Sequence, residues 1–316
     1  MSKDRLFIVV PCYNEQQVLS TTDERLRNLL RIMVDENFVA PDSRILYVND
    51  GSTDNTWSII ERLTTEHECV CGLKLAANVG HQCALLAGLE QAAKVADITV
   101  SIDADLQDDI NVIPEMVAKW RNGADIVYGV RRRRDTDSWF KRNTALTFYR
   151  LMQHLGVRSV YNHADFRLMS RRAVEQLCRF RERNLFLRGM VPLVGYKSDT
   201  VTYDRSARMA GESKYPLGKM LNFAADGITS FSIKPVRLVL WLGVIFTFVA
   251  LVILAYVLIA YFTGRTVSGW ASLMLSIWFV GGFVLIGLGI VGEYIGKIYI
   301  EVKDRPRYNV EQAIIK

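Results

Sequence analysis

Two hydrophobic patterns divide the chain. Up to residue 129, short apolar runs alternate with segments whose apolar residues recur at helical spacing. The runs predict buried strands and the spaced segments predict helices, an alternation typical of an α/β domain with a mostly parallel sheet. The predicted strands are residues 6–11, 44–49, 98–103 and 124–129, and the predicted helices are residues 18–34, 56–66 and 81–93.

The second pattern fills the last quarter of the chain. No Asp, Glu, Lys or Arg occurs in residues 238–264 or in residues 266–292, and Arg265 alone separates the two stretches. Each stretch exceeds the roughly 20 apolar residues that cross the hydrocarbon core of a bilayer. Residues 235–296 are therefore predicted to form a hairpin of two transmembrane helices. Glycines in the second stretch would allow close helix packing, within the hairpin or between subunits.

Basic residues orient this hairpin. Lys234, Arg237 and Lys297 flank it at the ends away from its loop, so the positive-inside rule puts the large domain and both termini in the cytoplasm. The expected organisation is a cytoplasmic domain (1–215), an amphipathic juxtamembrane helix (216–234), the two transmembrane helices (235–296) and a cytoplasmic tail (297–316). Residues 216–231 could lie in the membrane interface or pack on the domain.

Charge and cysteine content narrow the location further. The net charge is +6, and the basic residues concentrate in the run 131–134 and beside the apolar spans. This distribution suits anionic headgroups of the inner (plasma) membrane, so we expect no nucleic-acid partner. The apolar run near the N-terminus is too short for a secretory signal. The five scattered cysteines indicate reduced thiols.

Polar residues follow three of the predicted strands. Tyr13, Asn14 and Glu15 follow the first, Asp50 the second, and the Asp103-Ala104-Asp105 segment closes the third. In parallel sheets, ligands bind beyond the carboxyl ends of the strands, so these side chains predict a binding site.

Each acidic motif has a chemical interpretation and a structural one. Asp103 and Asp105, as alternate residues of an extended segment, would point to one side and could hold a divalent cation with Gln107; on a surface loop they would simply be solvated. Asp50 could accept hydrogen bonds from a nucleotide base or ribose. Asp54 could instead cap the following helix.

Several motifs together resemble one enzyme family. The segments Pro11-Cys12-Tyr13-Asn14-Glu15, Asn49-Asp50-Gly51-Ser52-Thr53-Asp54 and Asp103-Ala104-Asp105-Leu106-Gln107-Asp108 resemble the signatures of family 2 glycosyltransferases with the GT-A fold. Ala164-Asp165-Phe166-Arg167-Leu168, Arg188-Gly189, the segment from Arg208 to Tyr215, and Gly292-Glu293-Tyr294-Ile295-Gly296 resemble its polyprenyl-phosphate branch, which includes bactoprenol glucosyltransferases and, more distantly, dolichol-phosphate mannose synthases. Relatives with paired prolines after the Asp-x-Asp segment differ from the Gln107-Asp108-Asp109 found here, which leaves the role of Asp108 open.

The resemblance implies a reaction and a set of site residues. The donor would be a UDP-sugar, the acceptor a polyprenyl (undecaprenyl) phosphate, and the outcome inversion with Mg²⁺ or Mn²⁺. The implied nucleotide-binding residues are Pro11, Tyr13, Glu15, Asp50 and Asp103; the implied metal ligands are Asp103, Asp105 and Gln107; the implied catalytic residues are Asp165, Arg131, Arg188, Arg208 and Lys214.

Charge sets the mechanistic problem for such a reaction. The acceptor phosphate is already anionic, since its second pKa is about 6, and needs little help from a base. The harder task is to bring two anions together, for which arginines are suited. Asp165 could act as a base, orient the acceptor, or only pair with Arg167. His81 is interpreted as a capping or packing residue.

Alternatives differ in substrate and in class. Glucose is the expected sugar, while N-acetylglucosamine and galactose stay open. A processive synthase is disfavoured because the sequence lacks a Gln-x-x-Arg-Trp motif. A membrane scaffold with a vestigial nucleotide site is the remaining alternative. The resemblance also allows a homotetramer.

Overall fold

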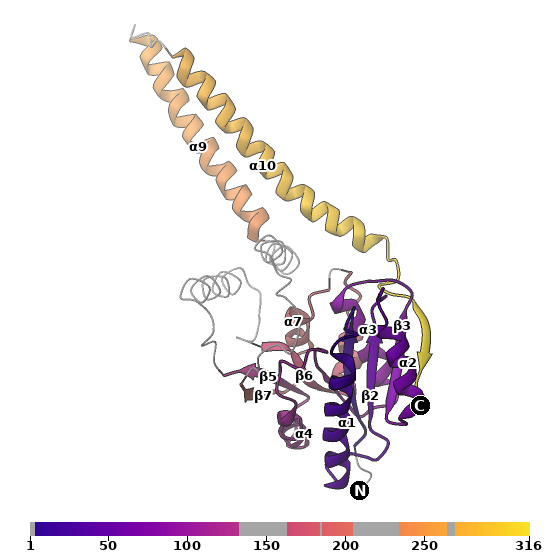
Figure 1. Ribbon diagram of the computed structural model, residues 1–316. Helices are drawn as coiled ribbons and strands as arrows, with labels where there is room; N and C mark the ends of the chain where they lie inside the picture. Colours follow the sequence, from indigo (N-terminus) through magenta and orange to yellow (C-terminus); the bar gives the residue numbers. More distant parts are fainter. Residues whose placement is uncertain (1–3, 133–162, 184, 205–233, 264–268) are drawn as a thin grey trace. The chain divides into compact units, whose positions relative to one another are not determined.

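The computed structural model describes residues 4–132, 163–183, 185–204, 234–263 and 269–316 (Figure 1). Contacts divide the chain into two compact units. The first holds the N-terminal sheet domain together with residues 305–316, and the second holds the two long C-terminal helices. Each unit is described by itself.

An eight-stranded mixed sheet organises the first unit. The order is β7-β5-β6-β4-β1-β2-β3-β8. The pairs β4–β1, β1–β2, β2–β3 and β5–β7 are parallel. Strand β6 is antiparallel to both β4 and β5, and β8 is antiparallel to β3. The mostly parallel α/β sheet predicted from the sequence is confirmed. The strands are β1 (Leu6–Cys12), β2 (Arg44–Asn49), β3 (Val70–Leu75), β4 (Ile98–Ser101), β5 (Ile126–Arg131), β6 (His163–Ser170), β7 (Ser198–Tyr203) and β8 (Val310–Ile314).

Helices cover both faces of this sheet because strand residues alternate between them. Leu6, Ile8 and Val10 of β1 belong to one core cluster that includes side chains of α1, α2 and α4. On the opposite face, Gly88 of α3 lies so close to Val9 and Val48 that an added Cβ would come within 2.5 Å of Val9. The helical elements are α1 (Leu19–Asp35), α2 (Thr56–Glu66), α3 (His81–Ala93), η1 (Ile110–Val112), α4 (Ile113–Arg121), α6 (Arg171–Cys178), α7 (Leu187–Met190) and η2 (Val191–Val194).

Strand β4 is shorter than predicted. It ends at Ser101, and the amide of Leu106 donates to the carbonyl of Asp103 at 3.3 Å, which closes a turn. Leu106 has a φ of 43°. Asp103 and Asp105 therefore lie on a turn rather than on one side of an extended strand, because the chain leaves the sheet before it reaches them.

The end of the chain returns to the sheet. Residues 310–314 form β8, which pairs antiparallel with β3, and the Ala76 amide donates to the Asn309 carbonyl at 2.9 Å. The Tyr308 hydroxyl also donates to Glu90 of α3. Residues 305–316, the last part of the expected 297–316 tail, belong to the first unit.

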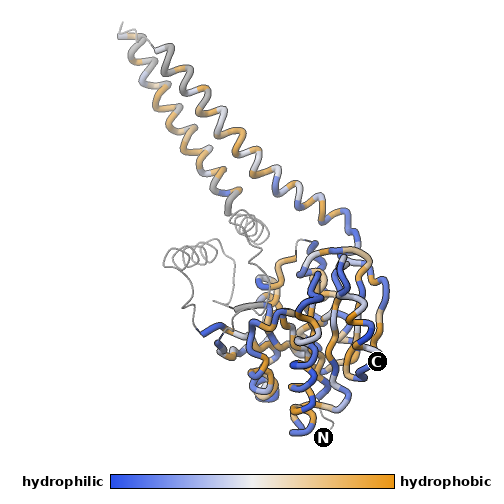
Figure 2. Tube along the Cα trace, in the orientation of Figure 1, coloured by the Kyte–Doolittle hydropathy of each residue, from blue (hydrophilic) through white to orange (hydrophobic). Residues whose placement is uncertain are grey.

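The second unit contains α9 (Lys234–Phe262) and α10 (Trp270–Val302), and hydrophobic residues predominate along both helices (Figure 2). Phe246 of α9 packs on Phe283 of α10 with ring centroids 5.0 Å apart. Within the described residues, the stretch Phe279–Val302 is long and apolar enough to cross a membrane, and α9 carries a shorter apolar stretch, Val239–Ile253. The predicted juxtamembrane helix lies outside the described residues.

Candidate active site

The turns after β1 and β2 are joined by hydrogen bonds. The Asn14 amide donates to the Ser52 hydroxyl at 3.0 Å, and the Thr53 amide donates to Asn14 Oδ1 at 2.9 Å. The Glu15 amide donates to the Thr56 hydroxyl at 2.9 Å. These bonds join the turn at residues 13–15 to the turn at residues 52–56 at the carboxyl edge of the sheet, and we call the two joined turns the frame.

The frame carries the predicted nucleotide-binding residues of β1. Pro11 is buried in β1 opposite Val48, while the side chain of Tyr13 is 43% exposed. Asp54 accepts hydrogen bonds from the amides of Thr56 and Gln16, so its carboxylate joins the two turns, although Asn55 rather than Asp54 is the N-cap of α2. The contacts of Pro11, Tyr13 and Glu15 with a nucleotide stay predictions.

Asp50 is buried and holds the segment before α3. Its Oδ1 accepts from the Val79 amide at 2.8 Å and its Oδ2 from the Gly80 amide at 3.0 Å. Burial raises the pKa of Asp50, and the two amide hydrogen bonds oppose that rise. Gly51 has a φ of 60°, and a Cβ there would lie 2.4 Å from the Asn78 nitrogen, so this close approach requires glycine. Asp50 therefore positions the start of α3 through these two hydrogen bonds.

The Asp-x-Asp turn presents an unsatisfied carboxylate oxygen. Asp103 Oδ1 is buried and accepts no hydrogen bond from any described residue. Burial raises the pKa of Asp103, as do the carboxylates of Asp165, Asp108 and Asp105, while His81 opposes the rise. Asp105 Oδ1 accepts from the amide of Gln107, whose side chain is largely buried.

These residues fit a hard cation only with further ligands. In the part of the chain that the structure describes, no group of three or more His, Cys, Asp or Glu side chains is arranged to hold a metal ion. Asp103 and Asp105 supply two carboxylates, and a carboxylate oxygen that accepts no hydrogen bond from the described residues suits Mg²⁺ or Mn²⁺. Such a site would be completed by oxygens from elsewhere, as a diphosphate would provide.

Asp165 lies on β6, almost fully buried between two guanidinium groups. Arg167 Nη2 donates to its Oδ1 at 3.1 Å, and Arg188 Nη2 donates to its Oδ2 at 3.0 Å. Burial by itself would raise the pKa of Asp165, but Arg188, His81 and Arg167 together hold it well below its usual range. The predicted Asp165–Arg167 pair thus exists, and Asp165 also reaches Arg188 of α7.

Arg167 is the most deeply placed charge of this cluster. Its side chain is fully buried, and among the described residues its Nε and Nη1 have no hydrogen-bond partner. Burial lowers the pKa of Arg167, while the charge of Asp165 opposes that effect. The guanidinium therefore acts chiefly on Asp165.

His81, which the sequence interpretation set aside, lies between the two acidic groups. Its Nε2 is 3.6 Å from Asp103 Oδ1 and 3.7 Å from Asp165 Oδ2. Burial lowers the pKa of His81, but the neighbouring Asp165 and Asp103 outweigh it and raise the pKa. Its position as the first residue of a helix, directly after Gly80, is the sequence signal that could have marked it.

Arg131, predicted as a phosphate ligand, is held by Asp108. Its Nη2 donates to Asp108 Oδ1 at 3.1 Å, and the Tyr203 hydroxyl donates to the same oxygen at 2.6 Å. Burial and the charge of Asp108 raise the pKa of Tyr203. The structure therefore connects Asp108, whose role was open, to Arg131 and Tyr203. Arg208 and Lys214 lie outside the described residues.

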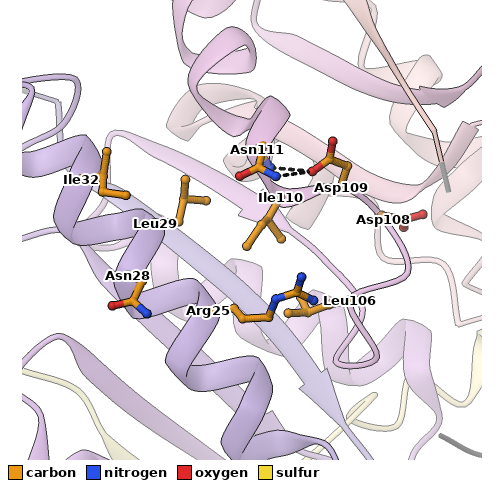
Figure 3. A pocket seen from close by; sticks show the side chains of 9 residues that line it. All are labelled: Arg25, Asn28, Leu29, Ile32, Leu106, Asp108, Asp109, Ile110 and Asn111. Atoms are coloured by element: carbon orange, nitrogen blue, oxygen red, sulfur yellow. Dashed lines mark hydrogen bonds between the residues drawn. The ribbon is translucent and has the colours of Figure 1, made fainter. Parts of the chain in front are cut away.

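A cavity of about 250 Å³ is lined by Leu106 and Asp108, which follow the Asp-x-Asp segment in the chain (Figure 3). It is formed between α1 and the segment that leads into η1, and Asp109 and Asn111 hydrogen-bond to each other at its rim. Asp108 both lines this cavity and forms the ion pair with Arg131. Asp103, Asp165, His81 and Arg188 do not line it, so it is separate from the charged cluster. Its lining residues are Arg25, Asn28, Leu29, Ile32, Leu106, Asp108, Asp109, Ile110 and Asn111.

A mostly parallel sheet that carries an Asp-x-Asp turn and a buried carboxylate held by arginines at its carboxyl edge has the features expected of a glycosyltransferase with the GT-A fold. Residues 7–178 match the family model of glycosyl transferase family 2. The chain belongs to this family.

Relatives match the chain along almost its whole length. An uncharacterized glycosyltransferase, YkoT, of Bacillus subtilis (strain 168) is 53% identical over 98% of this chain and 92% of its own. The SfII prophage-derived bactoprenol glucosyl transferase of Shigella flexneri is 40% identical over 98% of each chain. Among solved structures, glucosyl-3-phosphoglycerate synthase from Mycobacterium tuberculosis aligns with a TM-score of 0.48 and 20% identity, over 72% of this chain and 79% of that one.

Proposed function

We propose that this glycosyltransferase moves a hexose, with glucose as first choice, from a UDP-sugar to a polyprenyl phosphate at the cytoplasmic face of the membrane. The observation that carries the proposal is the 40% identity to a bactoprenol glucosyl transferase over 98% of both chains, the apolar helices included. A partial match confined to the sheet domain would support only the reaction class, because many acceptors are used on one fold.

The proposed chemistry needs no proton transfer. A phosphate oxygen of the acceptor attacks the anomeric carbon, and the bond from that carbon to the diphosphate oxygen breaks with its electron pair, which leaves UDP and inverts the configuration. Asp165, whose pKa is lowered well below the usual range, is a weak base at neutral pH. Its proposed role is to hold Arg188 in place for the acceptor phosphate.

Cations would reduce the repulsion between acceptor and donor. Asp103 and Asp105 would hold Mg²⁺ or Mn²⁺, which offsets charge on the leaving diphosphate when it is bound. Arg131 and Arg188, with Arg208 and Lys214 as further candidates, would contact phosphate oxygens. Guanidinium groups suit this role because they donate two parallel hydrogen bonds.

Chain connectivity supports a two-helix membrane hairpin. The chain leaves the sheet after β7 and rejoins it at β8, and both strands belong to one sheet. Because the two ends are in one folded domain, any membrane crossings between them must be even in number. If α10 crosses, a second crossing is required, and α9, although its apolar stretch is shorter, is the proposed one.

The test is to incubate membranes containing the chain with undecaprenyl phosphate and radiolabelled UDP-glucose, UDP-galactose and UDP-N-acetylglucosamine. Lipid-extractable label from one donor, lost on chelation and in Asp103→Asn, is the expected result. Activity with another UDP-sugar would change the proposed donor and leave the proposed acceptor as it is. A folded chain that labels no lipid and gains no stability from UDP with Mn²⁺ would favour the scaffold alternative.

A further inference from the structure

The start of α3 contacts several parts of the candidate site. Asp50 holds the amides of Val79 and Gly80 at 2.8 and 3.0 Å, directly before the helix. Gly80 has a φ of 89°, a left-handed conformation that favours glycine. The buried carboxylate of Asp50 therefore fixes the backbone directly before His81 and Gln82.

The imidazole of His81 lies between the two acidic centres of the site. Its Nε2 is 3.6 Å from Asp103 and 3.7 Å from Asp165, nearly equal separations. Asp103 is on the turn after β4 and Asp165 is on β6, so the ring spans two adjacent strands. Two carboxylates this close repel each other, and a polar ring between them sets how near they come.

Gln82 ties the same helix to the arginine side of the site. Its Oε1 accepts from the Leu187 amide at 2.9 Å, and Leu187 is the first residue of α7. The next residue, Arg188, donates to Asp165 Oδ2 at 3.0 Å. The start of α3 thus touches Asp165 directly through His81 and indirectly through α7.

We propose that His81 is a positioning residue that sets the separation between Asp103 and Asp165, with Gln82 holding the helix that carries Arg188. The inference rests on the proposed function, in which Asp103 serves the donor and Asp165 the acceptor. A reacting phosphate and an anomeric carbon must meet within a narrow geometry, and a misplacement of about 1 Å can lower a rate ~10²-fold. Loss of the imidazole should therefore lower kcat and leave donor binding little changed.

The experiment compares His81→Phe, which keeps a ring and removes its nitrogens, with His81→Gln, which keeps a polar side chain of similar reach. His67→Gln, at the end of α2, is the matched control. Full-length enzyme in nanodiscs is assayed for kcat and for the KM of donor and acceptor, and its melting temperature is recorded. We expect His81→Phe to lose kcat by about 10²-fold, His81→Gln to recover part of it, and the donor KM to stay within about two-fold of wild type in both.

The outcomes separate this inference from the function on which it rests. An active wild type with unchanged kcat in folded His81→Phe overturns the positioning role alone. A large rise in donor KM at constant kcat also overturns it, because His81 would then be a donor-binding residue. If His81→Phe does not fold, His81→Gln decides, and wild-type kcat with a raised donor KM in that variant contradicts the proposal. A wild type inactive with every UDP-sugar overturns the proposed function and this inference with it.

Discussion

Asp108 and Arg131 form an ion pair with an N–O distance of 3.1 Å that joins the segment after the Asp-x-Asp turn to the end of β5. The side chain of Asp108 is 2% exposed and that of Arg131 is 22% exposed. The Tyr203 hydroxyl shares the same carboxylate oxygen. The guanidinium is therefore held in one orientation, which a phosphate-binding arginine needs.

Replacing Asp108 by Ala should destabilise the sheet domain. Loss of the Asp108 carboxylate removes a charged hydrogen-bond partner from Arg131, whose side chain is partly buried, and costs about 1–3 kcal/mol. The change in melting temperature of the purified chain measures this effect. Asp204→Asn is the control, since its pair with Arg132 is mostly exposed and its loss should cost about 0.5 kcal/mol or less. Equal melting of the two variants would show that the buried pair is not structural.

Metal and nucleotide should bind together. Asp103 and Asp105 supply only two carboxylates, so Mn²⁺ alone should stabilise the chain little, whereas UDP with Mn²⁺ should raise the melting temperature clearly. A ligand at one hundred times its Kd contributes about 2.7 kcal/mol. Differential scanning fluorimetry with each ligand alone and with both tests this expectation.

Asp103→Asn should lose the combined effect, and Asp109→Asn, whose carboxylate binds Asn111 instead, should keep it. Strong stabilisation by Mn²⁺ without UDP would contradict the two-carboxylate site. So would a combined effect that survives in Asp103→Asn.

The sequence pattern predicted strands β1, β2, β4 and β5 and missed β3, β6, β7 and β8. The predicted strands at 6–11 and 44–49 are apolar runs, and the structure has them as β1 and β2. Strand β6 was missed because it carries Asp165 and Arg167 in its interior, where each charge is buried by pairing with the other. Strand β7 was missed because four of its six residues are polar and exposed, which leaves no apolar run. Strand β8 was missed because its five residues are mostly exposed and carry no apolar run of their own.

Chain order predicted where several candidate site residues lie, while their roles stay predictions. Asp50, Asp103 and Asp105 follow strands, so their position could be inferred from chain order. His81 and Asp108 could not be assigned, since their roles come from partners that are distant in sequence: Asp165 for His81 and Tyr203 for Asp108. A single sequence does not contain these pairings.

The returning strand β8 should stabilise the sheet domain. It covers the edge of β3 along Gly72 to Leu75, an edge that would otherwise expose unpaired backbone groups. Deletion of residues 309–316 should lower the melting temperature, by about 2–4 °C for each kcal/mol lost, and increase aggregation. Glu311→Gln, which removes only an exposed pair with Lys74, should change stability by at most about 1 kcal/mol. Wild-type melting of the truncated chain would contradict this role of β8.

The environment of Asp165 predicts how stability and rate respond to pH. Arg188, His81 and Arg167 hold its pKa well below the usual range despite burial, whereas an unfolded Asp titrates near ~3.9. A carboxyl with a lowered folded pKa stabilises the fold fully above the unfolded value, and this stabilisation is lost as pH falls through the folded value. Asp165→Asn should thus melt below wild type throughout about pH 5 to 8, with a gap that narrows as His81, whose pKa Asp165 raises, loses its proton, and the gap should close at acid pH only below about pH 4.

The same variant separates an orienting role from a base. The acceptor phosphate loses its second proton at about pH 6, so we expect the rate of wild type to rise with pH near that value and the rise to persist in Asp165→Asn at a lower kcat. Asp199→Asn, at an exposed carboxylate paired with Lys119, is the control and should match wild type in rate. If Asp165 were the base, folded Asp165→Asn would have no turnover at any pH. Turnover that is reduced but keeps the rise near about pH 6 would contradict a base role for Asp165, and the same rise in His81→Gln would assign it to the acceptor phosphate rather than to the imidazole, whose pKa is raised by Asp165 and Asp103.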